Sequence, residues 1–273
     1  MPLPIPVVMD QGAPRTGGLL ALARGLPAGW ERGISFTDAS CTLPVVMGEC
    51  PTGDDLKPAQ GLDTDTFRPV ELIQAIACTT LGGGPPTNVA GEALDQTRDY
   101  ALARELLTGA ASARDAADPD HANPSLVGTA VPLATTPFLA GALACLEARM
   151  AYATGGRDGF VLAGVDMATH LLANDLIWRD GSRWRTAAGS TVVISAGFDG
   201  RGPGATAPPD AGDMLSLYAV ANLWAGVGTR TVLSDVNRAD NTATERVEDV
   251  ALAAFPTCAV FAATSDEVTS CGL

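Results

Sequence analysis

The chain has 273 residues, of which 47% are hydrophobic and 18% are charged, and its formal net charge is −14 at pH 7. This composition is too apolar for a disordered chain, and the length suits one large domain or two modest ones. The acidic balance argues against a protein that grips nucleic acid through its phosphates over its whole surface. No run of 18 or more apolar residues occurs, so we expect no membrane partner.

The first 80 residues are rich in turns. Residues 1–28 contain many prolines and glycines, which predicts an extended N-terminal arm. The segment from Trp30 to Phe36 alternates enough to form a strand, and a long stretch with many Pro and Gly residues follows it. A loop of this length is unusual inside a compact domain. We therefore expect residues 29–80 to form an extended loop that packs on a neighbouring molecule.

Two helices are expected next. Residues 89–108 carry a narrow apolar stripe, which indicates a helix only half covered within its own subunit, and Gly109 is a plausible C-terminal stop. Residues 136–154 have a broad apolar face. Thr136 is the expected N-cap of this second helix, and Pro137 takes the first helical position, where its missing N–H is harmless.

The second half of the chain favours short strands. Phe160 to Ala163 predicts a strand, and Asp166 to Ala173 predicts a short helix. Asp180-Gly181 separates two segments that each contain Trp and Arg, which predicts a β-hairpin with a two-residue turn. Further strands are expected over 191–195, 214–224, 229–233 and 258–263, and a long mixed segment is expected over 242–254.

No pattern supports catalysis or metal binding. The sequence contains neither a C-x-x-C motif nor a G-x-S-x-G motif. Residues 82–84 are glycines, but Pro85 and Pro86 follow them and remove the backbone donors that a phosphate-binding loop would use. The two histidines, His121 and His170, have no partner at metal-ligand spacing. We therefore expect no catalytic, cofactor-binding or metal-binding residue.

The chain has six cysteines. Three of them, Cys78, Cys145 and Cys258, lie among apolar residues, which predicts buried thiols. Cys41 and Cys50 flank a short turn-rich segment and could face each other, but a disulfide is not expected in a protein made in a cytosol.

The predicted hairpin combines aromatic and basic side chains. Trp178 and Arg179 precede its turn, and Arg183 and Trp184 follow it. Such a set can form an arginine–aromatic stack at a contact between subunits. It is equally compatible with an ordinary hairpin that has amphipathic side chains.

The order of these elements resembles the tailed-bacteriophage major capsid fold, which encapsulins share. In that fold a long spine helix ends at a Leu/Phe-x-Gly turn, as Leu107-Thr108-Gly109 does here, and a Pro-x-Gly-like stretch leads to the next domain. The fold then continues with a strand and a helix, a hairpin and a strand, and it closes with a charged strand, a proline and an apolar strand. The matching segments are 123–128, 159–163, 166–172, 176–185, 189–195 and 244–262.

The resemblance implies an α+β fold with an axial domain, a peripheral domain with a long spine helix, an extended loop and an N-terminal arm. The expected divisions are the arm at 1–28, the extended loop region at 29–80, the spine helix and a peripheral segment at 81–135, the axial domain at 136–235, and the closing peripheral strands at 236–273.

The resemblance also implies a function. The chain would be a major capsid (head) protein, not an enzyme, that self-assembles through hexameric and pentameric capsomers into an icosahedral shell around double-stranded DNA. Separate scaffolding, cement and portal proteins would be its partners, the host bacterial cytoplasm the place of assembly, and the virion capsid its location. An encapsulin-like nanocompartment shell and a phage tail-tube or head-joining protein are the alternatives.

The residues expected at contacts between subunits come partly from the resemblance. Some members of the family cross-link a loop lysine to an asparagine, and Lys57 is the only lysine of this chain. The set of expected contact residues is Trp30, Lys57, Trp178, Arg179, Arg183 and Trp184.

Overall fold

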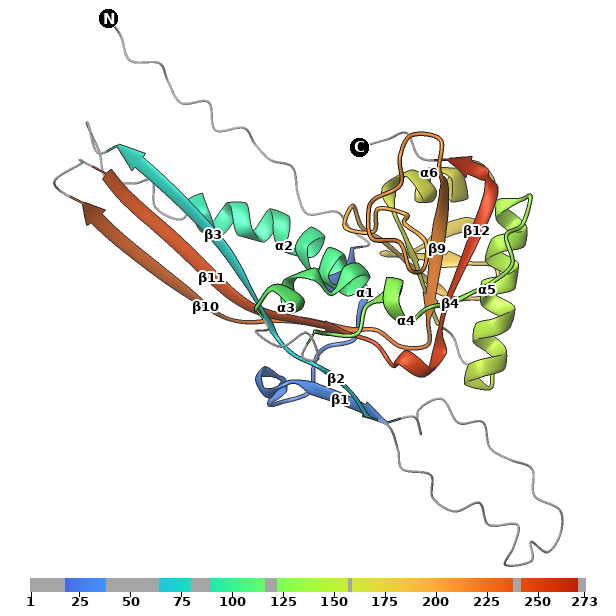
Figure 1. The fold of residues 1–273 in the computed structure, drawn as a ribbon, viewed down its shortest axis with the longest axis horizontal. Coiled ribbons are helices and arrows are strands. Elements are labelled where there is room, and N and C mark those ends of the chain that lie inside the picture. The colour runs from blue at the N-terminus through green and yellow to red at the C-terminus, as the bar shows by residue number, and fades with distance from the viewer. Residues whose placement is uncertain are drawn as a thin grey trace, which may run out of the picture.

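The computed structural model describes residues 18–37, 64–79, 89–115, 122–156, 159–237 and 242–269. The expectations for residues 1–17, Lys57, the 82–86 segment and His121 lie outside these residues. The described chain has an α+β fold made of two bodies that lie side by side, with a small β-hairpin projecting from their junction (Figure 1). No helix of the described part is long and apolar enough to cross a membrane.

The first body, called here the long body, is a helix laid along a narrow antiparallel sheet. Helix α2 (Val89–Thr108) has 20 residues and runs along one face of the sheet (Figure 1). The sheet has the order β10-β11-β3. In the central strand, Ala243, Val247 and Ala251 alternate with more exposed residues, so these side chains are buried beneath the helix layer. The strands are β3 (Val70–Thr79), β10 (Trp224–Asn237) and β11 (Thr242–Ala254).

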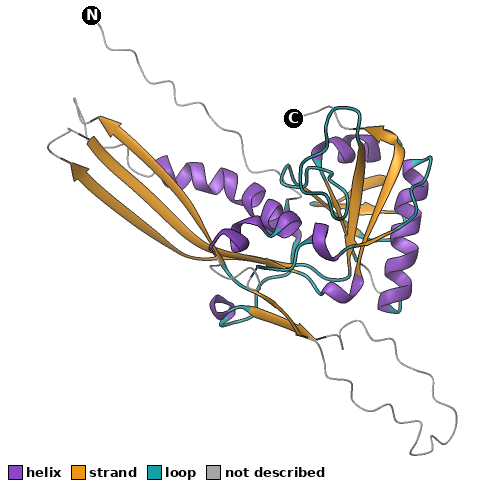
Figure 2. Cartoon of the chain, viewed as in Figure 1, coloured by secondary structure: helices purple, strands orange, loops and turns teal. Residues whose placement is uncertain are grey.

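The second body, called here the compact body, is built on a seven-stranded mixed sheet with the order β4-β12-β9-β5-β8-β7-β6. Helix α5 (Leu139–Thr154) packs on β12 and β9, and helix α6 (Val165–Ala173) contacts β6. Figure 2 shows the strands gathered in these separate sheets, with helices beside each. The strands are β4 (Val131–Pro132), β5 (Phe160–Ala163), β6 (Ile177–Asp180), β7 (Arg183–Thr186), β8 (Thr191–Ile194), β9 (Met214–Val220) and β12 (Val260–Thr269).

The central strands of the seven-stranded sheet are buried on both faces. Along β9, Leu215 and Leu217 belong to the core that includes α5 and α6, whereas Tyr218 and Val220 belong to the core that includes α2. Successive side chains of a strand point to opposite faces, and both faces of β9 are covered. β9 is therefore nearly continuously apolar and contributes to both cores. One face of the seven-stranded sheet is therefore covered by the long body.

The remaining elements connect the two bodies. The small hairpin is formed by β1 (Ile34–Thr37) and β2 (Thr64–Phe67), and its root is fixed by aromatic contacts. The ring centroids of Phe67 and Phe255 are 5.1 Å apart, and those of Phe36 and Trp224 are 4.9 Å apart. The short helical elements are α1 (Leu19–Leu22), η1 (Trp30–Arg32), α3 (Ala110–Asp115), α4 (Leu126–Thr129) and η5 (Thr257–Ala259).

The predicted start of helix α5 was wrong. The helix begins at Leu139, and the Thr136 hydroxyl donates to the Phe138 carbonyl instead of capping the helix. The N–H of Leu139 donates a hydrogen bond to the carboxylate of Glu267 in β12, at 2.8 Å. A carboxylate at a helix N-terminus accepts from an otherwise unpaired backbone N–H and interacts favourably with the positive end of the helix dipole. A residue 128 positions away therefore replaces the local cap.

The predicted hairpin is confirmed, with its turn displaced by one residue. Asp180 pairs with Arg183, so Gly181 and Ser182 form the turn. Gly181 has a φ of +60°, as glycine adopts at the first central position of a II′ turn. The predicted stop at Gly109 is also confirmed, because Gly109 has a φ of +63° directly after α2.

Three strands lie in sheets other than the sequence-based divisions suggested. Strand β10, most of which falls in the expected axial segment 136–235, pairs with β11 in the long body. Strand β3, from the segment expected to be an intermolecular loop, pairs along its length with β11 of the same chain. Strand β12, expected beside the peripheral strands, pairs with β9 in the seven-stranded sheet. The chain changes sheets at Phe255-Pro256, and Phe255 is fully buried there.

The prediction of buried thiols was wrong for two cysteines. Cys145 is free and exposed on α5, because the buried face of this helix is formed by Leu139, Leu143 and Leu146. Cys258 is exposed and disulfide-bonded. The side chain of Cys78 lies outside the described part of the structure.

Candidate functional site

The described residues hold no cluster suited to metal binding, since no group of three or more His, Cys, Asp or Glu side chains could hold an ion there. His170 lies on α6, where it is half-buried and its carbonyl accepts a bond from Asn174. The polar features of the structure are instead networks that connect elements far apart in the sequence. One of these networks lies between the two bodies.

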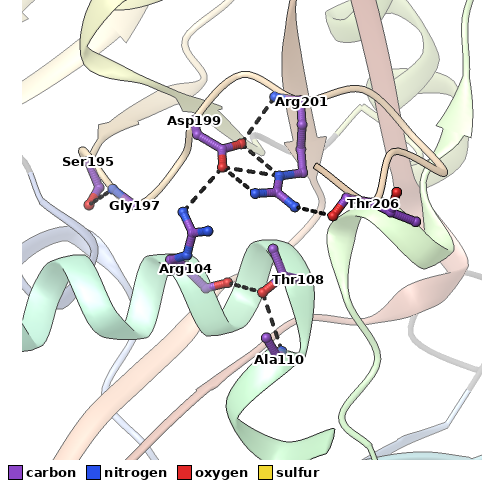
Figure 3. A network of polar contacts seen from close by, with 8 residues as sticks. All are labelled: Arg104, Thr108, Ala110, Ser195, Gly197, Asp199, Arg201 and Thr206. Atoms are coloured by element: carbon purple, nitrogen blue, oxygen red, sulfur yellow. Dashed lines mark hydrogen bonds and ion pairs between the residues drawn. The ribbon is translucent and has the colours of Figure 1, made fainter. Parts of the chain in front are cut away.

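This junction network is centred on Asp199 (Figure 3). The Asp199 side chain is only 1% exposed, and it accepts bonds from Nε and Nη2 of Arg201 at 2.9 and 2.6 Å. Nη1 of Arg104, from helix α2, lies 3.3 Å from the same carboxylate. One buried carboxylate thus binds two guanidinium groups, one from each body, and the hydrogen bond to Asp199 raises the pKa of Arg201.

Glycine makes this approach possible. A Cβ on Gly197 would lie 2.4 Å from the carbonyl oxygen of Tyr100 and 2.7 Å from the backbone nitrogen of Arg104. The loop backbone therefore rests directly on helix α2, which only glycine permits at this position. The rest of the loop is held by Tyr218, whose hydroxyl donates to the Arg201 carbonyl at 2.8 Å. Burial raises the pKa of Tyr218, so the donor stays protonated.

A second ionic network lies within the long body. Arg230 of β10 forms a bidentate pair with Asp249 of β11, with both N···O distances 2.9 Å. The same guanidinium reaches Asp95 of helix α2 at 2.5 Å. Arg98 adds an ion pair with Asp95 at 3.1 Å. This network therefore fastens the helix to the two long strands.

A third network fixes the root of the small hairpin. The side chain of Asn123 accepts from the N–H of Arg68 at 2.7 Å and donates to the Arg68 carbonyl at 2.9 Å. It also donates to Glu105 near the end of helix α2, at 3.3 Å. The buried Glu105 carboxylate accepts the N–H groups of Ala111 and Ser112 at 2.7 and 3.2 Å. The point where β2 leads into β3 is thereby tied to the end of the long helix.

The carboxylates of these three networks are all engaged in contacts. Each is paired with an arginine or accepts backbone N–H groups. Their common effect is to hold elements of the two bodies and the hairpin root in fixed relative positions. The structure thus supports a positioning role for the three polar networks.

The residues expected at contacts have different environments. Trp178 is 46% exposed, and Arg179 and Arg183 are exposed beside it on the β6–β7 hairpin. Trp184, opposite Arg179, packs against the core of the compact body. Trp30 also packs within its own chain. Its ring lies so close to Gly228 that a Cβ added to this glycine would be 3.2 Å from it. A role of any of them between subunits stays a prediction.

Sequence reasoning missed the networks themselves. The alternation of β11 places Glu245 and Asp249 on the same buried face as Val247, which is a sequence pattern that indicates a buried partner. No comparable pattern marks Asp199 or Asn123, because each lies in a loop and has a partner from a distant segment, Arg104 for Asp199 and Arg68 for Asn123.

No family model and no curated protein matches the chain. Among solved structures, the capsid of a native GTA particle matches with a TM-score of 0.60 at 12% identity, covering 97% of this chain and 95% of that one. A chain of Mycobacterium phage Ogopogo matches with a TM-score of 0.56 at 15% identity, covering 96% and 97%. A chain of Gordonia phage Cozz matches with a TM-score of 0.55 at 14% identity, covering 97% and 91%. The expected phage major-capsid fold is therefore confirmed over nearly the whole chain.

Proposed function

We propose that this chain is the major capsid protein of a tailed phage and self-assembles into an icosahedral shell that encloses double-stranded DNA. The observation that carries the proposal is the likeness to the capsid of a native GTA particle, which spans nearly all of both chains. A likeness that leaves almost nothing of either chain unmatched favours the same role for the whole subunit, and not only for a shared core.

The incomplete burial of the long body supports assembly. Val232, Leu233 and Val236 of β10 are each more than half exposed, and Ile73 of β3 is 47% exposed. β10 is an edge strand of its sheet within the described part of the chain. Exposed apolar side chains on a long edge strand are rare in monomers and are characteristic of surfaces that another chain covers.

The architecture also supports a division of labour within the shell. We assign the axial role to the compact body and the peripheral role to the long body, with α2 as the spine helix. The β1–β2 hairpin projects away from both (Figure 1) and would carry the extended loop over a neighbour. The three polar networks would keep these parts in the fixed orientation that a closed shell needs.

The assembly and its partners follow from this assignment. Copies of the chain would form hexameric and pentameric capsomers, and separate scaffolding, cement and portal proteins would act with them. The shell would contain DNA without reading its sequence, which agrees with the acidic net charge of −14. Assembly would take place in the cytoplasm of the host bacterium, and the chain would perform no catalysis.

Assembly of the purified chain tests the proposal. We expect the full chain, alone or with its scaffolding protein, to sediment as large particles that electron microscopy shows to be closed icosahedral shells. Open tubes or small rings would contradict a shell and favour a tail-tube or head-joining protein. A compact monomer that binds a small molecule would contradict assembly altogether. Shells that enclose an enzyme instead of DNA would favour a nanocompartment.

A further inference from the structure

The β6–β7 hairpin exposes an apolar and a positively charged side chain, Trp178 and Arg183, on one face. Arg183 is paired opposite Asp180, which shares a face with Trp178, whereas Arg179 lies on the other face. Strand β6 is the edge of the seven-stranded sheet, and Trp178 on it is 46% exposed. Arg179 and Arg183 form no ion pair within the described part of the chain, although Nε of Arg179 donates to the Gly181 carbonyl at 3.0 Å. The third arginine, Arg185, is already occupied by Asp180 at 3.0 Å.

A segment elsewhere on the compact body has the opposite character. Asp210 and Asp213 are the only charged residues between Arg201 and Arg230, and both are exposed. Neither forms an ion pair with another described residue. Met214 follows them directly at the start of β9 and is 46% exposed. This segment therefore places an apolar side chain beside two free negative charges, and methionine sulfur makes favourable contacts with aromatic rings.

The two surfaces cannot meet within one copy. Strands β5, β8 and β7 lie between β9 and β6 in the sheet order. Four strand spacings of about 4.8 Å separate β9 from β6 by roughly 19 Å. A surface and its complement at different places on one subunit produce a head-to-tail contact, and such contacts close into rings when the rotation between copies permits.

We propose that the Trp178–Arg183 hairpin of one copy binds the Asp210–Met214 segment of a neighbouring copy, so that each copy uses both surfaces in a ring. This inference rests on the proposed function and names the contact within a capsomer. Arg183 faces Asp213, and Trp178, on the same face of the hairpin as Arg183, packs against Met214.

Charge favours a second copy over nucleic acid as the occupant of the hairpin. Asp180 lies at the hairpin tip and Asp175 lies two residues before the start of β6, so phosphates would meet carboxylates near the arginines of the hairpin. The chain carries an excess of acidic residues, and the carboxylates of Asp210 and Asp213 form no ion pair with any residue that the structure describes. Complementary charges of this kind select and orient a partner.

A charge exchange tests the contact. Arg183→Glu and Asp213→Arg, each alone, place like charges opposite one another and should raise the concentration needed for particle formation about tenfold or more. The variant with both changes restores opposite charges and should assemble near the wild-type concentration. Arg149→Glu is the matched control for charge, since Arg149 is exposed on α5 with no ion pair to another described residue. Trp178→Ala should impair assembly, and Tyr152→Ala, which removes another exposed aromatic ring, should not.

The readouts are sedimentation and electron microscopy, with circular dichroism to show that each variant is folded. Wild-type particles together with a double variant that assembles no better than Arg183→Glu would overturn this contact alone. Equal losses for Arg183→Glu and Arg149→Glu would also overturn it. If Arg183→Glu assembles normally but its protein loses binding to double-stranded DNA on a filter, the hairpin binds nucleic acid instead. A wild-type chain that never assembles would overturn the proposed function and this contact with it.

Discussion

The two bodies of the chain differ in how completely they bury their sheets. In the compact body, α5 and α6 cover one face of the seven-stranded sheet and the core shared with the long body covers the other. In the long body, helix α2 covers one face, and β10 keeps exposed apolar residues such as Val232 and Leu233. Because buried apolar surface stabilises a fold, the more completely buried sheet of the compact body should contribute more to stability. The apolar side chains exposed on β10 leave surface that favours association.

The largest loss of stability is expected when the ionic network between the two bodies is disrupted. Asp199→Ala leaves Arg201, which is 5% exposed, without its carboxylate. Removal of one partner of a buried ion pair should lower the free energy of unfolding by about 3–5 kcal/mol. Urea unfolding followed by circular dichroism measures this change. Arg104→Ala is the control and should cost less, because Asp199 keeps Arg201 and the Arg104 side chain is 38% exposed. Equal losses for the two variants would contradict the assigned role of Asp199.

A matched pair of leucines sharpens the comparison between the bodies. Leu217 in β9 is fully buried, and Leu233 in β10 is 51% exposed. Leu217→Ala should lower the free energy of unfolding by about 2–5 kcal/mol because it leaves a cavity. Leu233→Ala should change it by less than about 0.5 kcal/mol but should raise the concentration needed for assembly. Urea unfolding and sedimentation measure the two effects. A Leu233→Ala variant that loses as much stability as Leu217→Ala would contradict this difference between the two bodies.

The smallest effect is expected from pH, and it should be confined to the long body. The hydrogen bond from Arg230 lowers the pKa of Asp95 in the folded chain. The ionised carboxylate therefore stabilises the fold above the unfolded pKa, and this contribution is lost as the pH falls below about 4. Partial exposure of both side chains keeps the effect modest. Thermal unfolding between pH 3 and 6 should show a shallower pH dependence for Asp95→Asn than for the wild type. An unchanged slope would mean that the Arg230 pair adds no stability.

Elements with a strong local pattern were predictable. Phe160–Ala163 is the strand that its apolar run predicts, and α2 spans the expected residues 89–108. The hairpin was found because glycine is favoured where φ is positive, although Asp180 itself pairs in the strand and is not in the turn. The cap of α5 was not predictable, because Glu267 reaches Leu139 from the far end of the chain. The exposed positions of Cys145 and Cys258 were missed because apolar neighbours in sequence do not show which way a side chain points.

The candidate contact surfaces were predictable only in part. The sequence indicated the hairpin with Trp178, Arg179 and Arg183, and the structure places all three at the surface. It did not indicate that Trp184 packs inward, which follows from its position opposite Arg179 and beside the core. It also gave no reason to connect the hairpin with Asp213.

The sequence by itself determined which segments become helices and strands, because apolar spacing, glycines and prolines act through neighbouring residues. It also determined the lack of any recognised catalytic motif. Only the tertiary structure decided which residues form the polar networks. Arg104 and Asp199 are 95 positions apart in the sequence, and Asp95 and Arg230 are 135 positions apart. The same holds for the division into a covered and a half-covered sheet. Burial and ion pairing depend on which surfaces meet in space, and residues so distant in the chain leave no local pattern of their meeting.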